Sequence, residues 1–189
     1  MNKKLFLASL LFILLLSACG NKYEGQFSFE VNDFTYTNQD GESVSKSDLD
    51  GKFWVANMIF TECPDICPPM TANMARLQKM LSEEGLDVGL ISFSVDPTND
   101  TPEVLKDYAN NYGINFDNWS FLTGYTDAEI KTFLNESFKA YVDKPEGSDT
   151  VIHQSTFYLV SPEGNAINGY NGSKAEEMNK IVEDIKSMN

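Results

Sequence analysis

Two cysteines and one histidine are the residues of this chain best suited to metal or redox chemistry. Cys63 and Cys67 lie four positions apart, directly after the apolar run 53–60 and before two consecutive prolines. Thiolates bind soft metal ions and also exchange disulfides, so the pair forms either a metal site or a redox couple. His153 is the only histidine in the chain. A site that needs sulfur and imidazole together can therefore be built in only one way.

The position of the two cysteines favours their thiolate forms. Pro68 and Pro69 suit the first turn of a helix, which places the cysteines at its N-terminal end, where the helix dipole lowers a thiol pKa. On a regular helix, side chains at i and i+4 lie about 5–6 Å apart at Cβ, whereas a disulfide needs about 3.8 Å. We therefore expect a loop at Cys63 that is not fully helical and that can rearrange between metal-bound and disulfide forms.

Residues 1–18 are typical of the signal peptide of a bacterial lipoprotein. Two lysines precede the apolar run 5–16, and residues 16–19 (Leu-Ser-Ala-Cys) match a lipobox. The apolar run is about a dozen residues long, short of the roughly 20 that a transmembrane helix needs. We expect cleavage before Cys19, lipidation of Cys19, a tether over residues 19–26, and anchoring at the extracytoplasmic face of the cell membrane. The alternative is an ordinary secretory signal with a cysteine there by chance.

The remaining chain is long enough for one domain, expected over residues 27–189. Removing the two signal-peptide lysines from the 14 basic residues leaves 12 against 28 acidic ones, a formal charge of −16. Such a surface repels nucleic acid and anionic lipid headgroups, so membrane attachment must come from the acyl chains. Outside the cytosol, an unprotected thiol pair tends to become a disulfide.

The hydrophobic pattern predicts a sheet flanked by helices. Alternating apolar residues from Phe27 to Tyr36 and the turn at Asp40 and Gly41 predict an opening hairpin. The expected strands, mostly buried, are 53–60, 88–95 and 119–122, with a second hairpin from 155–160 and 166–170. The expected helices run from Pro68 to about Leu81, from Pro102 to about Tyr112, and onward from capping boxes at Thr126 and Ser173. This order indicates an α/β, thioredoxin-like fold, with a mixed central sheet, helices on both faces and an N-terminal β-hairpin.

Three segments resemble blocks of the SCO/SenC family of copper proteins of cytochrome c oxidase assembly. Residues 60–68 (FTECPDICP) are similar to the signature of the family, and residues 94–108 (SVDPTNDTPEVLKDY) are similar to its second block. His153, followed by residues 156–164 (TFYLVSPEG), resembles the third. The resemblance runs from about Phe27 to the C-terminus, and the three blocks are in the family's order.

The resemblance implies a metallochaperone rather than an enzyme. It implies one copper ion per domain, Cu(I) or Cu(II), held by Cys63, Cys67 and His153. It also implies a role in building the binuclear copper centre of cytochrome c oxidase subunit II. A copper donor and a thiol reductase are further candidate partners. Independently, thiolates suit Cu(I), and imidazole is acceptable to both oxidation states.

Other functions fit part of the pattern. A thiol–disulfide oxidoreductase would use Cys63 and Cys67 as a redox-active disulfide to keep the copper-ligand cysteines of the oxidase reduced, but it needs no distant histidine. A thiol peroxidase, a zinc site and a purely structural disulfide are weaker alternatives. Met70 and Met74 offer soft ligands, but their helical spacing favours core packing.

Two residues near the ligands are candidates for supporting the metal. Asp96 is one, although Asp-Pro after a strand is also ordinary turn chemistry. Glu62 is the other, and it stands where a histidine is common in the family. Ile152 departs from the family pattern, because many members have an aspartate directly before the histidine. A carboxylate hydrogen-bonded to His153 is therefore not supplied by its neighbour.

Overall fold

The computed structural model describes residues 23–145, 147–148 and 150–189. The predicted signal peptide, Cys19 and the first part of the predicted tether lie outside the described residues. The other residues of the predicted tether contact the domain: Tyr23 is buried edge-on against Phe53, and the Gln26 amide donates to Asn168 Oδ1. Among the described residues, no helix has the length and apolarity needed to cross a bilayer.

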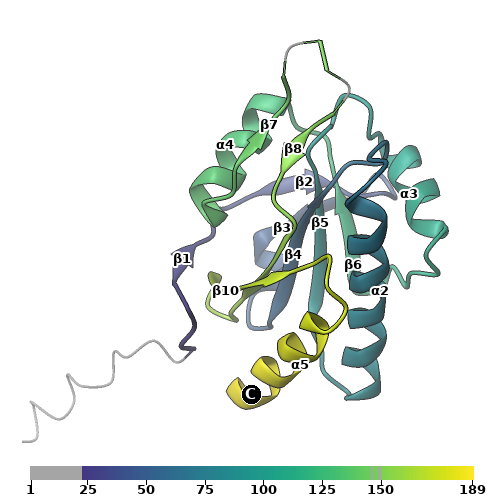
Figure 1. Cartoon of the computed structure of the whole chain (residues 1–189). Coiled ribbons are helices and arrows are strands. Elements are labelled where there is room, and N and C mark those ends of the chain that lie inside the picture. Colours follow the sequence, from purple (N-terminus) through teal and green to yellow (C-terminus); the bar gives the residue numbers. More distant parts are fainter. Residues whose placement is uncertain (1–22, 146, 149) are drawn as a thin grey trace, which may run out of the picture.

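A six-stranded mixed sheet forms the centre of the molecule (Figure 1), in the order β1-β10-β9-β4-β5-β6. Strand β4 (Trp54–Ile59) runs parallel to β5 (Gly89–Ser94), which runs parallel to β6 (Trp119–Leu122). Every residue of β4 and β5 is buried, as predicted for the mostly apolar segments 53–60 and 88–95. On the other side of β4, the predicted hairpin of β9 (Thr156–Val160) and β10 (Asn165–Asn171) is antiparallel.

Two small hairpins lie outside the central sheet. The first joins β2 (Thr35–Thr37) to β3 (Ser43–Ser45) around the predicted turn at Asp40 and Gly41. The segment before it does not belong to this hairpin: β1 (Phe29–Glu30) pairs with β10 at the sheet edge. The second hairpin was not predicted, and it joins β7 (Val142–Asp143) to β8 (Ile152–His153).

Helices cover both faces of the sheet, which confirms the predicted fold class. Helices α2 (Cys67–Glu83), α3 (Pro102–Asn110) and α5 (Glu177–Met188) pack on one face. Helix α4 (Asp127–Phe138) packs on the other, together with Leu49 of the 3-10 helix η2 (Lys46–Leu49). Figure 1 shows α2 and α5 side by side, away from α4. Met70 and Met74 are fully buried in the core under α2, as their spacing predicts.

Only one of the two predicted capping boxes exists. Thr126 Oγ1 accepts a hydrogen bond from the Glu129 amide (3.2 Å), and the Glu129 carboxylate accepts from the Thr126 amide (2.7 Å). The box predicted at Ser173 is wrong. The Ser173 hydroxyl and amide both donate to Asn171 Oδ1, and α5 begins only at Glu177. The nearer Asn171 side chain therefore holds Ser173 in a turn before the helix.

Thr126→Ala should destabilise the protein by about 1 kcal/mol, because it removes a working helix cap. Ser173→Ala is the matched control and should change the free energy of unfolding by less than about 0.5 kcal/mol. Urea unfolding of the reduced protein measures both values. Equal losses in the two variants would contradict the assignment of the caps.

Candidate metal and thiol centre

The two cysteines lie where β4 leaves the sheet and α2 begins. Cys67 is the first residue of α2, whereas Cys63 lies in the preceding loop, where its amide donates to the Phe60 carbonyl oxygen (3.3 Å). The Cys67 amide donates to Cys63 Sγ (3.4 Å). Both cysteines are buried and both are free thiols. As expected from their spacing, the chain is not helical at Cys63, and the loop turns its sulfur back towards the helix N-terminus.

The two thiols have opposite electrostatics. Burial opposes ionisation of Cys63, but the amides of Cys67, Asp65 and Ile66 and the Cys67 thiol all donate to its sulfur, so its pKa is lowered. For Cys67, burial raises the pKa strongly, and the nearby charges of Cys63 and Asp100 raise it further. The prediction of lowered thiol pKa values is therefore right for Cys63 and wrong for Cys67, because only Cys63 receives the free amides at the helix end.

The single imidazole lies against the buried thiol. His153 Nε2 is 3.4 Å from Cys67 Sγ, although 86 positions separate the two residues. The other ring nitrogen, Nδ1, is 3.0 Å from the Gln154 carbonyl oxygen. A carbonyl accepts only, so Nδ1 carries the proton in the neutral ring, and the Nε2 lone pair faces the sulfur. Burial lowers the pKa of His153, and the Phe60 ring packs edge-on against the imidazole.

The fold thus brings the three predicted site residues together. Cys67 is the middle member: it contacts Cys63 on one side and His153 on the other. Within the part of the chain that the structure describes, no group of three or more acidic, cysteine and histidine side chains is already disposed around one metal position. The donor set is nevertheless chemically coherent, since two sulfurs and one neutral imidazole nitrogen are ligands that copper accepts in both oxidation states.

The other candidate residues do not contact these three side chains. Glu62 is exposed, with no hydrogen bond or ion pair found to any described residue. Asp96 is buried, but its carboxylate accepts hydrogen bonds from Lys144 and Asn99 instead. Ile152 is half exposed and precedes His153 in β8, so the two side chains point to opposite faces of the hairpin. A side chain at position 152 is therefore directed away from the imidazole.

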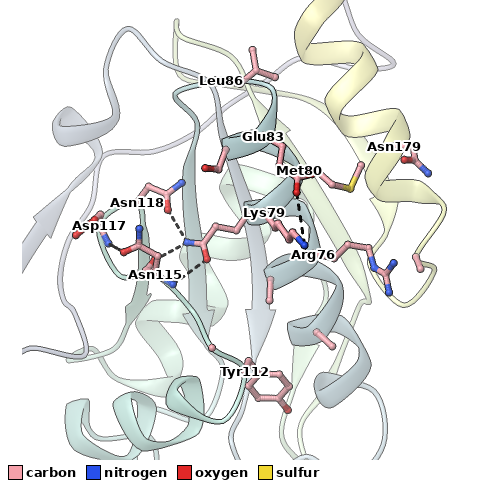
Figure 2. A pocket seen from close by; sticks show the side chains of 16 residues that line it. Arg76, Lys79, Met80, Glu83, Leu86, Tyr112, Asn115, Asp117, Asn118 and Asn179 are labelled. Atoms are coloured by element: carbon pink, nitrogen blue, oxygen red, sulfur yellow. Dashed lines mark hydrogen bonds and ion pairs between the residues drawn. The ribbon is translucent and has the colours of Figure 1, made fainter.

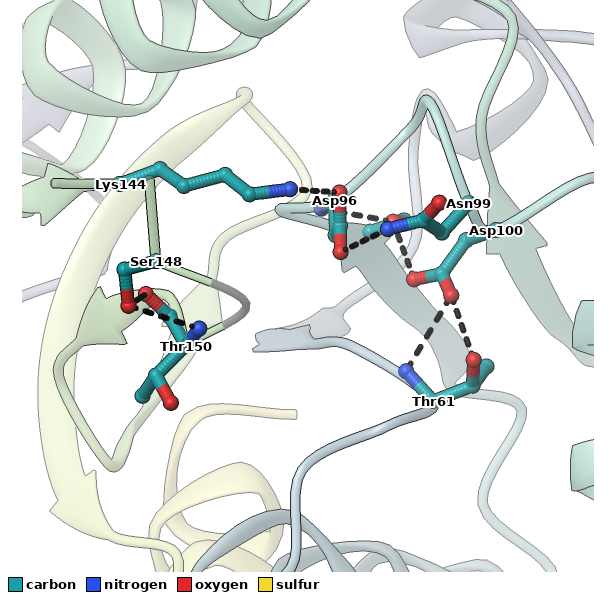
Figure 3. A network of polar contacts seen from close by, with 8 residues as sticks. Thr61, Asp96, Asn99, Asp100, Lys144, Ser148 and Thr150 are labelled. Carbon is teal, nitrogen blue, oxygen red and sulfur yellow. Dashed lines mark hydrogen bonds and ion pairs between the residues drawn. The ribbon is translucent and has the colours of Figure 1, made fainter. Parts of the chain in front are cut away.

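Two polar residues near the site were missed by the sequence analysis. Asp100 is 1% exposed and accepts hydrogen bonds from the Thr61 amide and hydroxyl and from the Ser94 hydroxyl. Burial raises the pKa of this carboxyl group. Lys144 forms an ion pair with Asp96 (Figure 3). Asp100 and Asp96 both lie in residues 94–108, the second segment that resembles the family, so this segment could have pointed to Asp100. No sequence pattern indicated Lys144.

A groove elsewhere on the surface is not part of this centre. It is open, has a volume of about 1210 Å³ and lies beside the exposed side of α2, lined by Arg76, Lys79 and Tyr112 among others (Figure 2). Its walls contain no cysteine or histidine. Gln78 joins the helix to the loop before β6 by hydrogen bonds to the Asn115 carbonyl oxygen and Asn118 Oδ1. None of the three predicted site residues, Cys63, Cys67 and His153, lines this groove.

Comparison with known proteins agrees with the sequence resemblance. The SCO1/SenC family model matches residues 23–189. The SCO1 protein homolog of Bacillus subtilis is 52% identical over 180 residues, which are 95% of this chain and 93% of the relative.

Solved structures are similar over nearly the same length. A SCO1/SenC family lipoprotein from Bacillus anthracis has a TM-score of 0.82 at 43% identity, covering 86% of this chain and 98% of the other. The structure of BsSco has a TM-score of 0.80 at 53% identity, covering 88% of this chain and 96% of the other. BsSco is a member of the Sco family of cytochrome c oxidase assembly proteins and has a disulfide switch. Yeast Sco1 with copper bound has a TM-score of 0.68 at 29% identity, covering 85% and 90%. Since the family model spans the whole described region and a relative of nearly equal length is more than half identical, this chain belongs to the SCO1/SenC family.

Proposed function

We propose that this protein binds one copper ion through Cys63, Cys67 and His153 and delivers it to the binuclear copper centre of cytochrome c oxidase subunit II. The observation that carries the proposal is the contact between Cys67 Sγ and the Nε2 lone pair of the only histidine. The yeast relative with copper bound supports copper as the cargo, and the description of BsSco as an oxidase assembly protein supports the role.

The electrostatics of the site suit a metal that must be released again. Two thiolates and a neutral imidazole leave one negative charge with Cu(I) and none with Cu(II), so neither state buries a large charge. Burial keeps His153 neutral by lowering its pKa, and the Nδ1–H bond to Gln154 fixes the tautomer that presents Nε2. The raised pKa of Cys67 means that copper must displace a firmly held proton, so copper affinity should increase with pH.

His153→Ala should separate the copper function from the thiol function. Cu(II) needs more ligands than two sulfurs, so its affinity should fall by at least about 100-fold, since residues that only support metal ligands already contribute about 10–100-fold. Cu(I), which two thiolates satisfy, should lose less. Anaerobic titration with each ion, followed by the Cu(II)–thiolate absorption, measures the difference. The Cys63–Cys67 disulfide should still form on oxidation, which controls for misfolding.

Cells that build a copper-containing oxidase provide the second part of this test. A His153→Ala strain should lack oxidase activity if copper delivery is the function. Normal activity in His153→Ala together with loss of activity in Cys63→Ala would overturn the copper proposal and favour a thiol reductase.

A thiol–disulfide exchange activity is the second candidate, and the difference between the two thiols favours it. Cys63 has the lowered pKa and is the thiol with some exposure (8%), whereas Cys67 is fully buried with a raised pKa. Cys63 would attack a partner disulfide as a thiolate, and Cys67 would then resolve the mixed disulfide once its proton is removed. His153 Nε2 lies in position to accept that proton.

Cys63 should therefore react with iodoacetamide faster than Cys67. The thiolate is the nucleophile, so the rate at Cys63 should fall as the pH drops through its lowered pKa, while Cys67 stays slow across the neutral range. Peptide mass spectrometry of the reduced protein, alkylated anaerobically from pH 5 to pH 9 (about two units either side of neutrality), gives both rates. Faster labelling of Cys67 would show that the helix amides do not activate Cys63.

The proposed location is the extracytoplasmic face of the cell membrane, held there by lipid on Cys19. The lipobox before Cys19 supports this location, as does the similarity to a lipoprotein of Bacillus anthracis. The acidic composition leaves the acyl chains as the anchor, because it would not attract anionic headgroups.

Cys19→Ala should abolish incorporation of radioactive palmitate in growing cells and release the protein from the membrane fraction. The copper titration of this variant should match that of the wild type, because Cys19 takes no part in the site. Equal label in the two proteins would refute lipidation at Cys19.

A further inference from the structure

The hairpin that carries His153 is not part of the central sheet. Its strands β7 and β8 contain two residues each and pair only with one another, not with the six-stranded sheet. Val142 and Val151 bury their side chains in the core beneath it. Isolated two-stranded hairpins are marginally stable in water. Further contacts must therefore fix the hairpin if the imidazole is to stay against Cys67.

One such contact is an ion pair between Lys144, directly after β7, and Asp96. Lys144 Nζ is 2.7 Å from Asp96 Oδ1, and Asn99 Nδ2 donates to the other carboxylate oxygen (2.8 Å). Asp96 is 1% exposed, whereas the carboxylates of the other ion pairs among the described residues are 16% to 98% exposed. A buried carboxylate that loses its cationic partner carries a large energetic penalty, so this pair resists separation far more than the surface pairs do.

Asp96 begins a short segment that also reaches the cysteine loop. We call residues 96–100 the aspartate loop, and it follows β5 at the end of the sheet where the cysteine loop leaves β4. The Asn99 and Asp100 amides donate to the Asp96 carbonyl oxygen (3.0 and 2.9 Å), which makes the segment a closed turn. At its far end, Asp100 Oδ1 accepts from the Thr61 hydroxyl (2.6 Å) and amide (3.2 Å). Figure 3 shows Lys144 and Thr61 approaching the two carboxylates from opposite sides.

From this arrangement we propose that the aspartate loop is a brace that positions both halves of the copper site. Through Asp96 it holds the hairpin that carries His153, and through Asp100 it holds the loop that carries the cysteines. Lys144 and Thr61 are the positioning residues that connect each half to the brace. The site is thus aligned by side chains that bind neither copper nor a partner, and the inference rests on the proposed function only where it refers to copper.

Two variants each weaken one end of the brace. Lys144→Met removes the charge while keeping the length of the side chain, and Thr61→Val removes the shorter of the two hydrogen bonds to Asp100 while keeping the shape. Lys131→Met is the matched control for the first variant. Lys131 binds Asp143 of the same hairpin at the same 2.7 Å distance, but the two side chains of that pair are 53% and 35% exposed. Lys144→Arg keeps the charge and should restore the behaviour of the wild type.

The first measurement is amide hydrogen exchange of the reduced, metal-free protein. Lys144→Met should speed exchange in β7 and β8 by at least about tenfold, since the hairpin loses its ion pair with the buried Asp96, and should leave residues 61–67 unchanged. Thr61→Val should speed exchange in residues 61–67 and leave the hairpin unchanged. Lys131→Met should change neither segment. An unchanged hairpin in Lys144→Met, an equal effect of Lys131→Met, or faster exchange throughout β4 and β5 would overturn the brace.

The second measurement is Cu(II) titration of the same variants. Lys144→Met should lower the affinity for Cu(II) more than the affinity for Cu(I). His153→Ala should have the same effect to a larger extent, because Lys144→Met displaces the imidazole whereas His153→Ala removes it. If His153→Ala itself binds Cu(II) as the wild type does, the proposed copper site fails. The exchange data then still decide whether the aspartate loop positions the hairpin, so the two failures can be told apart.

Discussion

The contact between Cys67 Sγ and His153 Nε2 joins two parts of the molecule that share no sheet. Cys67 is fixed by the first turn of α2 and by the central strand before it, which is buried along its whole length. His153 is carried by a two-residue strand at the margin of the fold. The rest of the site depends on keeping the Cys67 sulfur and the His153 nitrogen close enough to bind one metal ion, while still allowing them to separate. A chaperone must form this contact reliably, and it must also open the site to its acceptor.

Burial at this contact has opposite consequences for its two members. For the imidazole, burial lowers the pKa and so favours the neutral ring that binds metal. For Cys67, burial raises the pKa and so favours the protonated thiol that does not. Cys63 differs from Cys67: its pKa is lowered, because the hydrogen bonds from the helix amides to its sulfur outweigh the effect of burial. The site therefore combines one thiol ready to react with one that ionises only when a metal or a base removes its proton. This asymmetry suits both copper binding and disulfide exchange, the two functions proposed for the centre.

The sequence predicted those features that local patterns determine. The continuous apolar run of β4 predicts a strand covered on both faces, and the capping box at Thr126 predicts the start of α4. The box at Ser173 failed because a side chain two residues earlier competes for the same hydroxyl. The hairpin β7–β8 is too short to show any periodicity. Two features depend on the complete fold, so no local sequence pattern could indicate them. One is the raised pKa of Cys67, and the other is the pairing of Lys144 with Asp96, which lies 48 positions away.

Because His153 is the only histidine, labelling histidine with ¹⁵N marks a single ring in the whole protein. Electron–nuclear double resonance on the Cu(II)-loaded, labelled protein tests directly whether that ring binds the metal. If His153 is a ligand, the spectrum should show one strong ¹⁵N coupling of a directly bound imidazole nitrogen, together with thiolate-to-copper charge transfer in the absorption spectrum. A Cu(II) centre that shows the charge transfer but no strong histidine coupling would contradict the assignment of His153 as a ligand.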